Sequence, residues 1–240
     1  MIAHRFDVLE STNLHLVRMA REGAPAWTVV LADAQSGGRG RSGRSWWSPR
    51  GGLYMSVLIR PPVPTGRLPR LPILASLAVL DAIGAPPLPV AVKWPNDLMS
   101  WGKKLAGILV TSRTEGAGVP WVVVGFGINL ARSDDPAPEE IRKKIAFLED
   151  ITPDLTRDQV AEGIVEALEG LVGCLEDDKG WEQAVRRWTQ SASWEVPCIH
   201  RDGTREVRGI PLRLAEDGGL VLRTDKGEIT VRSGEIVEAV

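Results

Sequence analysis

Residues 90–125, VAVKWPNDLMSWGKKLAGILVTSRTEGAGVPWVVVG, decide the fold. Short apolar or alternating runs are separated here by turn-forming residues, a pattern typical of strands. Trp101-Gly102-Lys103 predicts a hairpin turn. The strands are expected at Val90–Lys93, Leu98–Ser100, Lys104–Thr111 and Val119–Gly125. Because no helix separates them, we expect a largely antiparallel or mixed sheet.

The segment before this stretch adds strands and helices. Ile2–Val8 predicts a strand, and Glu10-Ser11-Thr12-Asn13 then supplies capping residues for a helix. Two further strands are expected at Trp27–Ala32 and Leu53–Ile59. Leu71–Ile83 is apolar almost all round, which predicts a helix in the core.

The segment after it changes from helix to strand. Thr156–Leu175 opens with a capping box and keeps its apolar residues on one face, so it predicts an amphipathic helix, and Trp181–Gln190 predicts a second. From Trp194 onward the pattern indicates a small β-barrel of about 45 residues. Its strands are expected at Glu195–His200, Glu206–Leu214, Leu220–Thr224 and Glu228–Arg232. The prediction is two domains, residues 1–190 and 191–240.

Composition limits the function classes. The 240 residues are 43% apolar and 25% charged with a net charge of -2, so global attraction to nucleic acid or acidic membranes is not expected. Without a signal core or an apolar run of about 18 residues, we expect a cytoplasmic protein. Cys174, Cys198 and the three histidines are too scattered to predict a metal cage built by the protein.

An arginine-rich loop follows the second predicted strand. Gly38–Ser45 nearly matches a dinucleotide-binding motif and a P-loop, but it opens into a strand where both motifs need a helix. Its arginines still suit phosphate, because guanidinium binds phosphate oxygens bidentately. Trp46 and Trp47 could stack on a purine. The alternatives are a solvated flexible loop, or a single-stranded nucleic-acid binder using the same residue types.

Two lysine-bearing motifs lie on the sheet. Lys93–Asp97 (KWPND) follows one predicted strand, and Lys104–Gly107 (KLAG) begins another. A lone lysine at a strand end is usually a solvated cap. Together with the arginines, these lysines could neutralise a triphosphate and the centre formed when its α-phosphorus is attacked.

Five motifs together resemble those of the biotin protein ligases. They are Glu10–Asn13 (ESTN), Gly38–Trp46 (GRGRSGRSW), Lys93–Asp97, Lys104–Gly107 and Gly125–Asn129 (GFGIN), in the family's order and over essentially the whole chain. The resemblance implies an α+β fold: a mixed β-sheet with flanking helices, similar to class II aminoacyl-tRNA synthetase catalytic domains, and a small C-terminal SH3-like β-barrel. The resemblance is to the ligase-only form of the family, so we expect no DNA-binding domain.

The resemblance also implies roles for individual residues. Biotin would be bound by Ser11, Thr12, Gln35, Gly38, Arg39 and Lys104. ATP and the adenylate would be bound by Arg41, Arg44, Trp46, Asn96, Lys104, Gly107, Ile128 and Asn129. The implied catalytic residues are Arg41, Lys93, Asp97 and Lys104.

The implied reaction has two steps. Biotin and ATP form biotinyl-5′-AMP, with Mg²⁺ held mainly by the phosphates, and the biotin then passes to a lysine of a biotin carboxyl carrier protein domain. The resemblance implies a homodimer, and we expect no DNA or membrane partner. Two alternatives stay open: a lipoate protein ligase with the same adenylation chemistry, and a non-catalytic nucleotide or RNA binding module.

Overall fold

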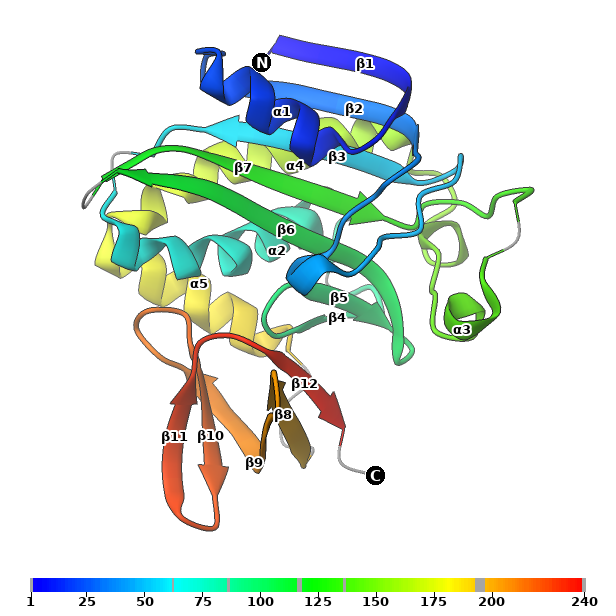
Figure 1. The fold of residues 1–240 in the computed structure, drawn as a ribbon. Helices are drawn as coiled ribbons and strands as arrows, with labels where there is room; N and C mark the ends of the chain where they lie inside the picture. The colour runs from blue at the N-terminus through cyan, green and yellow to red at the C-terminus, as the bar shows by residue number, and fades with distance from the viewer. Residues whose placement is uncertain are drawn as a thin grey trace.

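The computed structural model describes residues 2–61, 63–85, 87–115, 118–135, 137–192 and 197–238. Its main unit is a seven-stranded mixed sheet of order β1-β2-β3-β7-β6-β5-β4, with helices on both faces (Figure 1). The strands are β1 (Ile2–Leu9), β2 (Thr28–Gln35), β3 (Leu53–Ile59), β4 (Val90–Lys93), β5 (Asp97–Ser100), β6 (Lys103–Glu115) and β7 (Gly118–Ile128). The mixed sheet expected from the sequence is thus confirmed.

Strand pairing follows the turns in the sequence. β1 pairs with β2 in parallel, and every other neighbouring pair in this sheet is antiparallel. The predicted β5–β6 hairpin turn is present, and both Trp101 (φ 47°) and Gly102 (φ 72°) adopt the left-handed conformation that a tight two-residue hairpin needs.

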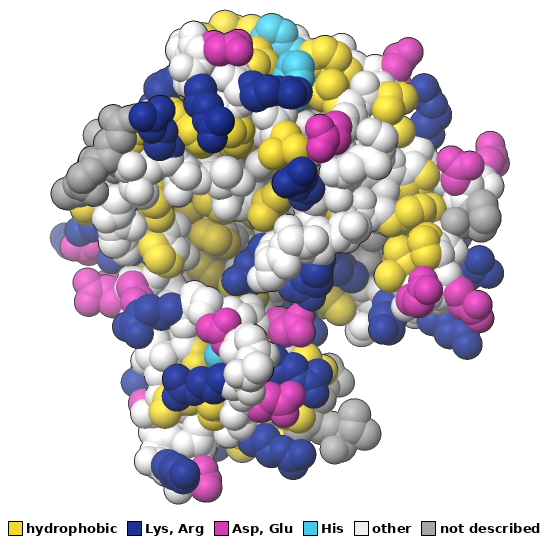
Figure 2. Space-filling model, in the orientation of Figure 1, with side chains coloured by type: hydrophobic (Ala, Val, Ile, Leu, Met, Phe, Trp, Pro, Cys, Tyr) yellow, Lys and Arg dark blue, Asp and Glu magenta, His cyan; other side chains and the backbone are white. Residues whose placement is uncertain are grey.

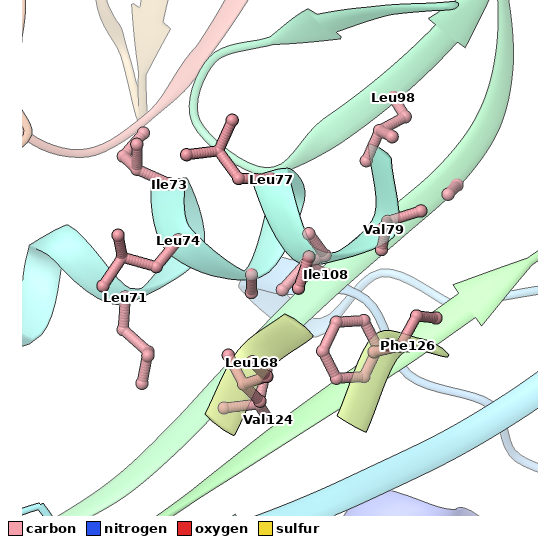
Figure 3. Packing of buried hydrophobic residues seen from close by; sticks show 14 of the residues in the cluster. Leu71, Ile73, Leu74, Leu77, Val79, Leu98, Ile108, Val124, Phe126 and Leu168 are labelled. Carbon is pink, nitrogen blue, oxygen red and sulfur yellow. The ribbon is translucent and has the colours of Figure 1, made fainter. Parts of the chain in front are cut away.

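The helices bury both faces of the sheet. α1 (Thr12–Arg21) covers one face, where Leu16 and Val17 pack on strand residues such as Val30. α2 (Leu71–Ala82), α4 (Arg157–Val172) and α5 (Asp178–Gln190) cover the other face. Figure 3 shows α2 side chains packed between the strands and Leu168 of α4. α2 is apolar all round because it is enclosed by the sheet on one side and by helices on the other.

The helix ends agree with the capping signals in the sequence. Ser11 is the N-cap of α1, and Thr156 and Gln159 form the predicted capping box of α4. A short helix, α3 (Glu139–Arg142), was not predicted. None of the helices in the described ranges is both long and apolar enough to cross a bilayer.

The C-terminal segment forms a second, antiparallel sheet of order β11-β10-β9-β8-β12. Its strands are β8 (Cys198–Asp202), β9 (Arg205–Leu214), β10 (Leu220–Thr224), β11 (Gly227–Val231) and β12 (Glu235–Glu238). No pairing between β11 and β12 closes it among the described residues, so the expected closed barrel is not found. β12 was not predicted, and residues 195–196 of the expected first strand lie outside the described ranges.

The second sheet packs directly against the main unit. Trp94 donates from Nε1 to the carbonyl of Gly218 at 3.1 Å, and the buried Arg70 donates from Nε to the carbonyl of Glu216 at 3.2 Å. Both bonds bury polar atoms at the contact, which specifies its geometry. The domain boundary after residue 190 stays a prediction.

Candidate ligand site

Two adjoining hollows lie beside the arginine loop. The first, called here the sheet hollow, is lined by Ser11, Thr12, Asn13, Gln35, Arg39, Gly40, Trp46, Asn96, Lys104, Gly107, Ile108, Leu109, Gly125, Phe126 and Gly127. The second, the loop hollow, is lined by Gly40, Arg44, Ser45, Trp46, Trp47, Asn96, Asp97, Lys104, Asn129, Ile141, Lys144 and Ile145. Gly40, Trp46, Asn96 and Lys104 border both, so they mark the junction.

A buried polar network forms one end of the sheet hollow. The Thr12 amide donates to Gln35 Oε1 at 2.9 Å, and the Thr12 hydroxyl lies 2.9 Å from that of Ser56. Gln35 Nε2 in turn donates to Ser48 Oγ at 2.9 Å. Ser11 and Thr12 are each 3% exposed although both are polar. The start of α1 therefore presents fixed donors and acceptors in a place shielded from water.

Glycines form the floor of the sheet hollow. Gly107 on β6 and Gly127 on β7 are paired across the sheet, and the Trp46 indole lies against both. A Cβ at Gly127 would lie 2.6 Å from Trp46 Cε2, and one at Gly107 would lie 2.9 Å from Cζ3. These positions must be glycine, because any side chain would displace the ring.

Trp46 has a polar atom that the fold leaves unsatisfied. Its Nε1 is buried and has no hydrogen-bond partner in the described residues. Lys104 Nζ lies 5.2 Å from the ring centroid, within the range of a cation–π contact. A buried indole N–H usually finds an acceptor, so this one is available to a ligand.

Charged groups are paired at the junction. Lys104 Nζ lies 2.8 Å from Asp97 Oδ1. Arg41 donates from Nη1 to Asn96 Oδ1 at 3.2 Å and to the Gly234 carbonyl at 3.3 Å. Burial lowers the pKa of the Arg41 guanidinium from its ordinary value, but such a group remains charged in proteins. Lys104 and Asp97 therefore place one cation and one carboxylate at the junction, whereas the predicted Arg41 lines neither hollow and reaches the junction through Asn96.

The remaining loop arginines are held only at the surface. Arg39 pairs with Glu10 at 3.5 Å, and Arg44 pairs with Glu235 of the second sheet at 2.6 Å. More than half of each arginine side chain is exposed. Ion pairs this exposed hold weakly, so a phosphate could replace the carboxylates.

Some predicted residues do not line either hollow. Gly38 lies outside the lining of both hollows and packs against Ser48 and the Trp46 carbonyl. Ile128 is fully buried in the main core. Lys93 lies near Cys198. Burial raises the pKa of the Cys198 thiol, and the charge of Lys93 opposes that shift. The ligand roles of these residues stay predictions.

The structure adds residues that sequence reasoning missed. Asn13 and Ser48 belong to the polar end, and Gly125 and Gly127 to the floor. Their signal was present: glycines two apart on a strand leave one face open for a ring. Ile141, Lys144 and Ile145 enter the loop hollow because the Lys104 amide donates to the Lys144 carbonyl at 2.7 Å, which no sequence pattern indicated.

The model of the biotin/lipoate A/B protein ligase family matches residues 5–129, more than half of the chain. The chain belongs to this family. A similarity over nearly the whole chain supports this membership. The chain is 32% identical to the biotin–[acetyl-CoA-carboxylase] ligase of Paracoccus denitrificans over 95% of its own length and 96% of that relative.

Other similarities differ in coverage. The bifunctional ligase/repressor BirA of Bacillus spizizenii is 40% identical over 57% of this chain, but the match spans only 42% of that relative. The structure of the biotin protein ligase from Aquifex aeolicus in complex with biotin and ATP superposes with a TM-score of 0.82 at 27% identity, covering 98% of this chain and 97% of that one. The family fold therefore extends over both sheets.

Proposed function

We propose that this chain is an ATP-dependent biotin protein ligase, which forms biotinyl-5′-AMP and transfers the biotin to a lysine of a carboxylase carrier domain. One observation carries the proposal. Lys104 and Asn96 border both hollows, so a ligand in each would meet at the same cation. Joining two substrates requires such a meeting point, and a simple binding module does not.

In this proposal biotin occupies the sheet hollow. Thr12, Gln35 and their neighbours offer donors and acceptors for the ureido group, and Leu109 and the glycine floor offer apolar contact for the rings and chain. The carboxylate would then extend to Lys104. Arg39 would line the bound ligand through its backbone, whereas Gly38, which lies outside the lining, would support this wall from behind.

ATP would occupy the loop hollow. Trp46 and the apolar Ile141 and Ile145 suit a purine, and Asn129, held by its own bond to the Lys104 carbonyl at 3.0 Å, offers polar contact. Arg44 and Lys144 provide positive charge for the phosphates. Magnesium would arrive with ATP as part of the substrate complex, sharing the phosphate charge.

In the first step a biotin carboxylate oxygen attacks the α-phosphorus, the bond to the β-phosphate oxygen breaks, and pyrophosphate leaves. Arg41 and Lys104 are fixed close to the site of developing charge by Asn96 and Asp97. Cations fixed before the reaction stabilise the transition state without reorganising. Pyrophosphate would leave past Arg44.

In the second step a neutral carrier lysine attacks the mixed anhydride. The new C–N bond forms, the bond from the carbonyl carbon to the phosphate oxygen breaks, and AMP leaves while the amine loses a proton. Asp97 would orient the amine and Lys93 would add positive charge. Neither step requires a covalent bond to the enzyme.

The rival within the family is lipoate. The GRGRSGRSW loop and the biotin ligase relatives favour biotin. Pyrophosphate release from Mg-ATP with biotin, lipoate or neither decides the matter: we expect release with biotin alone. Release with lipoate alone would establish a lipoate ligase. The absence of release with either acid would refute the proposed ligase activity.

Further proposals accompany this one. The five short antiparallel strands at the C-terminus support an SH3-like unit beginning near residue 191. A cytoplasmic location is proposed from the sequence pattern and a homodimer from the resemblance, and sedimentation of the purified chain tests the second.

A further inference from the structure

An exposed tryptophan stands at the tip of the β5–β6 hairpin. Three large apolar side chains in the described ranges are at least half exposed: Ile2 at 51%, Val8 at 54% and Trp101 at 62%. Single exposed aliphatic residues are ordinary. Trp101 differs because it is aromatic and because its backbone is in the left-handed region, at φ 47°.

The turn itself gives no reason for a tryptophan. A two-residue hairpin with both φ angles positive favours Asn, Asp or Gly at its first position, and a bulky side chain there is strained. The exposed ring gains little packing within the chain to offset that strain. Strained positions that persist without an internal benefit are characteristic of functional surfaces.

The hairpin tip lies next to the proposed acceptor position. β5 runs from Asp97 to Ser100, directly before Trp101, so about 13 Å of strand separates the tip from Asp97. A folded domain that inserts a lysine at Asp97 must therefore bring its own surface close to Trp101. Tryptophan is the residue type most enriched at the energetic centres of protein interfaces.

Several basic side chains lie near this tip. Lys103 follows it, and the bond from the Lys104 amide to the Lys144 carbonyl brings the basic end of α3 alongside. Arg142, Lys143 and Lys144 are exposed there, against the acids Glu139 and Glu140 at the start of α3. Figure 2 shows dark blue basic side chains along the lower rim of the lobe that carries α3, with magenta acidic side chains beside them. A chain of net charge -2 thus presents a local basic excess beside its exposed tryptophan.

We propose that Trp101, Lys103 and Lys143 form a docking surface for the acceptor protein, with Trp101 as its apolar anchor and the lysines selecting an acidic surface around the acceptor lysine. The inference rests on the proposed ligase function. The basic surroundings favour an acidic protein over a second copy of this chain, since the second copy would bring the same positive charges to the contact.

Trp101→Asn is the decisive variant. Asparagine suits the left-handed turn, so the variant is expected to fold with an unchanged or higher Tm. The probe is the unbiotinylated biotin carrier domain of an acetyl-CoA carboxylase. We expect the KM for this domain to rise at least tenfold while pyrophosphate release with biotin and ATP stays within twofold of wild type. Val8→Ala, on the opposite edge of the sheet, is the matched control and should change neither.

Charge reversal tests the second half of the proposal. The double variant Lys103→Glu, Lys143→Glu should raise the same KM and reverse its dependence on salt, whereas Lys226→Glu, on the β10–β11 turn, should not. An unchanged KM in Trp101→Asn would overturn the docking surface. A change in sedimentation with an unchanged KM would assign the tryptophan to self-association and also overturn it. If the wild type releases no pyrophosphate with biotin, the proposed function fails independently of this surface.

Discussion

The sheet hollow and the arginine loop are built in opposite ways. The hollow is set by paired strands, a helix N-terminus and buried hydrogen bonds, with Ser11 and Thr12 each 3% exposed. The loop is held by backbone bonds within itself, by the partly buried bonds of Arg41, and by two exposed ion pairs that reach Glu10 and the second sheet. Under the proposed function, the hollow would supply fixed polar partners for biotin, and the loop would supply arginines that can exchange their carboxylate partners for phosphate.

The largest effect is expected at the junction of the two regions. Lys104→Ala removes the cation shared by both hollows and leaves Asp97 unpaired. Biotin-dependent pyrophosphate release should fall at least about a hundredfold, because a fixed cation at the developing charge is lost. Tm should change little, since the side chain is 36% exposed. Lys103→Ala is the neighbouring control, and equal activity in both variants would contradict the assignment.

The preformed floor is tested next. Gly127→Ala places a methyl group against the Trp46 ring, which must move. We expect pyrophosphate release to fall by about tenfold and the free energy of unfolding by about 1–3 kcal/mol, as for other overpacked sites. Gly170→Ala in α4 is the control, because no atom lies within 4 Å of its added Cβ. Wild-type activity and Tm in Gly127→Ala would show that the ring does not depend on this floor.

The adaptable loop should respond more mildly. Glu235→Gln removes the charge that holds Arg44. Exposed pairs contribute at most about 1 kcal/mol, so trypsin cleavage of the ligand-free loop should accelerate by up to about fivefold. Biotin with ATP should slow cleavage in both proteins. Glu228→Gln, which breaks the Arg213 pair instead, should leave the loop unchanged, and protection of the loop by Glu235→Gln would contradict this view.

The smallest effect concerns the far end of the loop. Asp33 binds Arg157 of α4 and Arg50 of the loop, and the hydrogen bond from Arg157 chiefly lowers the pKa of its carboxyl. A lowered folded-state pKa stabilises the protein above the ordinary value of 3.8, and that stabilisation disappears as pH falls through the folded-state pKa. Asp33→Asn should therefore lower Tm slightly at pH 7 and less at pH 3. A difference in Tm between wild type and variant that becomes larger at pH 3 than at pH 7 would contradict the stabilising role of the ion pair.

Short-range signals predicted most of the fold. Strand β3, strand β4, strand β10 and the capping box of α4 lie where alternation and capping residues indicated, because these features depend on neighbours in the chain. β12 and α3 were missed because neither carries a local signal: Glu235–Glu238 does not alternate, and Pro138 gives α3 no side-chain cap.

The sequence by itself determined the order of the arginine-, lysine- and glycine-bearing motifs along the chain. It also determined that these motifs belong to a biotin or lipoate ligase family. Tertiary structure alone decided that Asn96 borders both hollows, that Trp46 lies on Gly107 and Gly127, and that Gly234 and Glu235 hold the loop from the second sheet. The reason is physical: residue type and local pattern are encoded over a few positions, whereas contacts between segments up to 193 residues apart follow from how the sheets and helices pack.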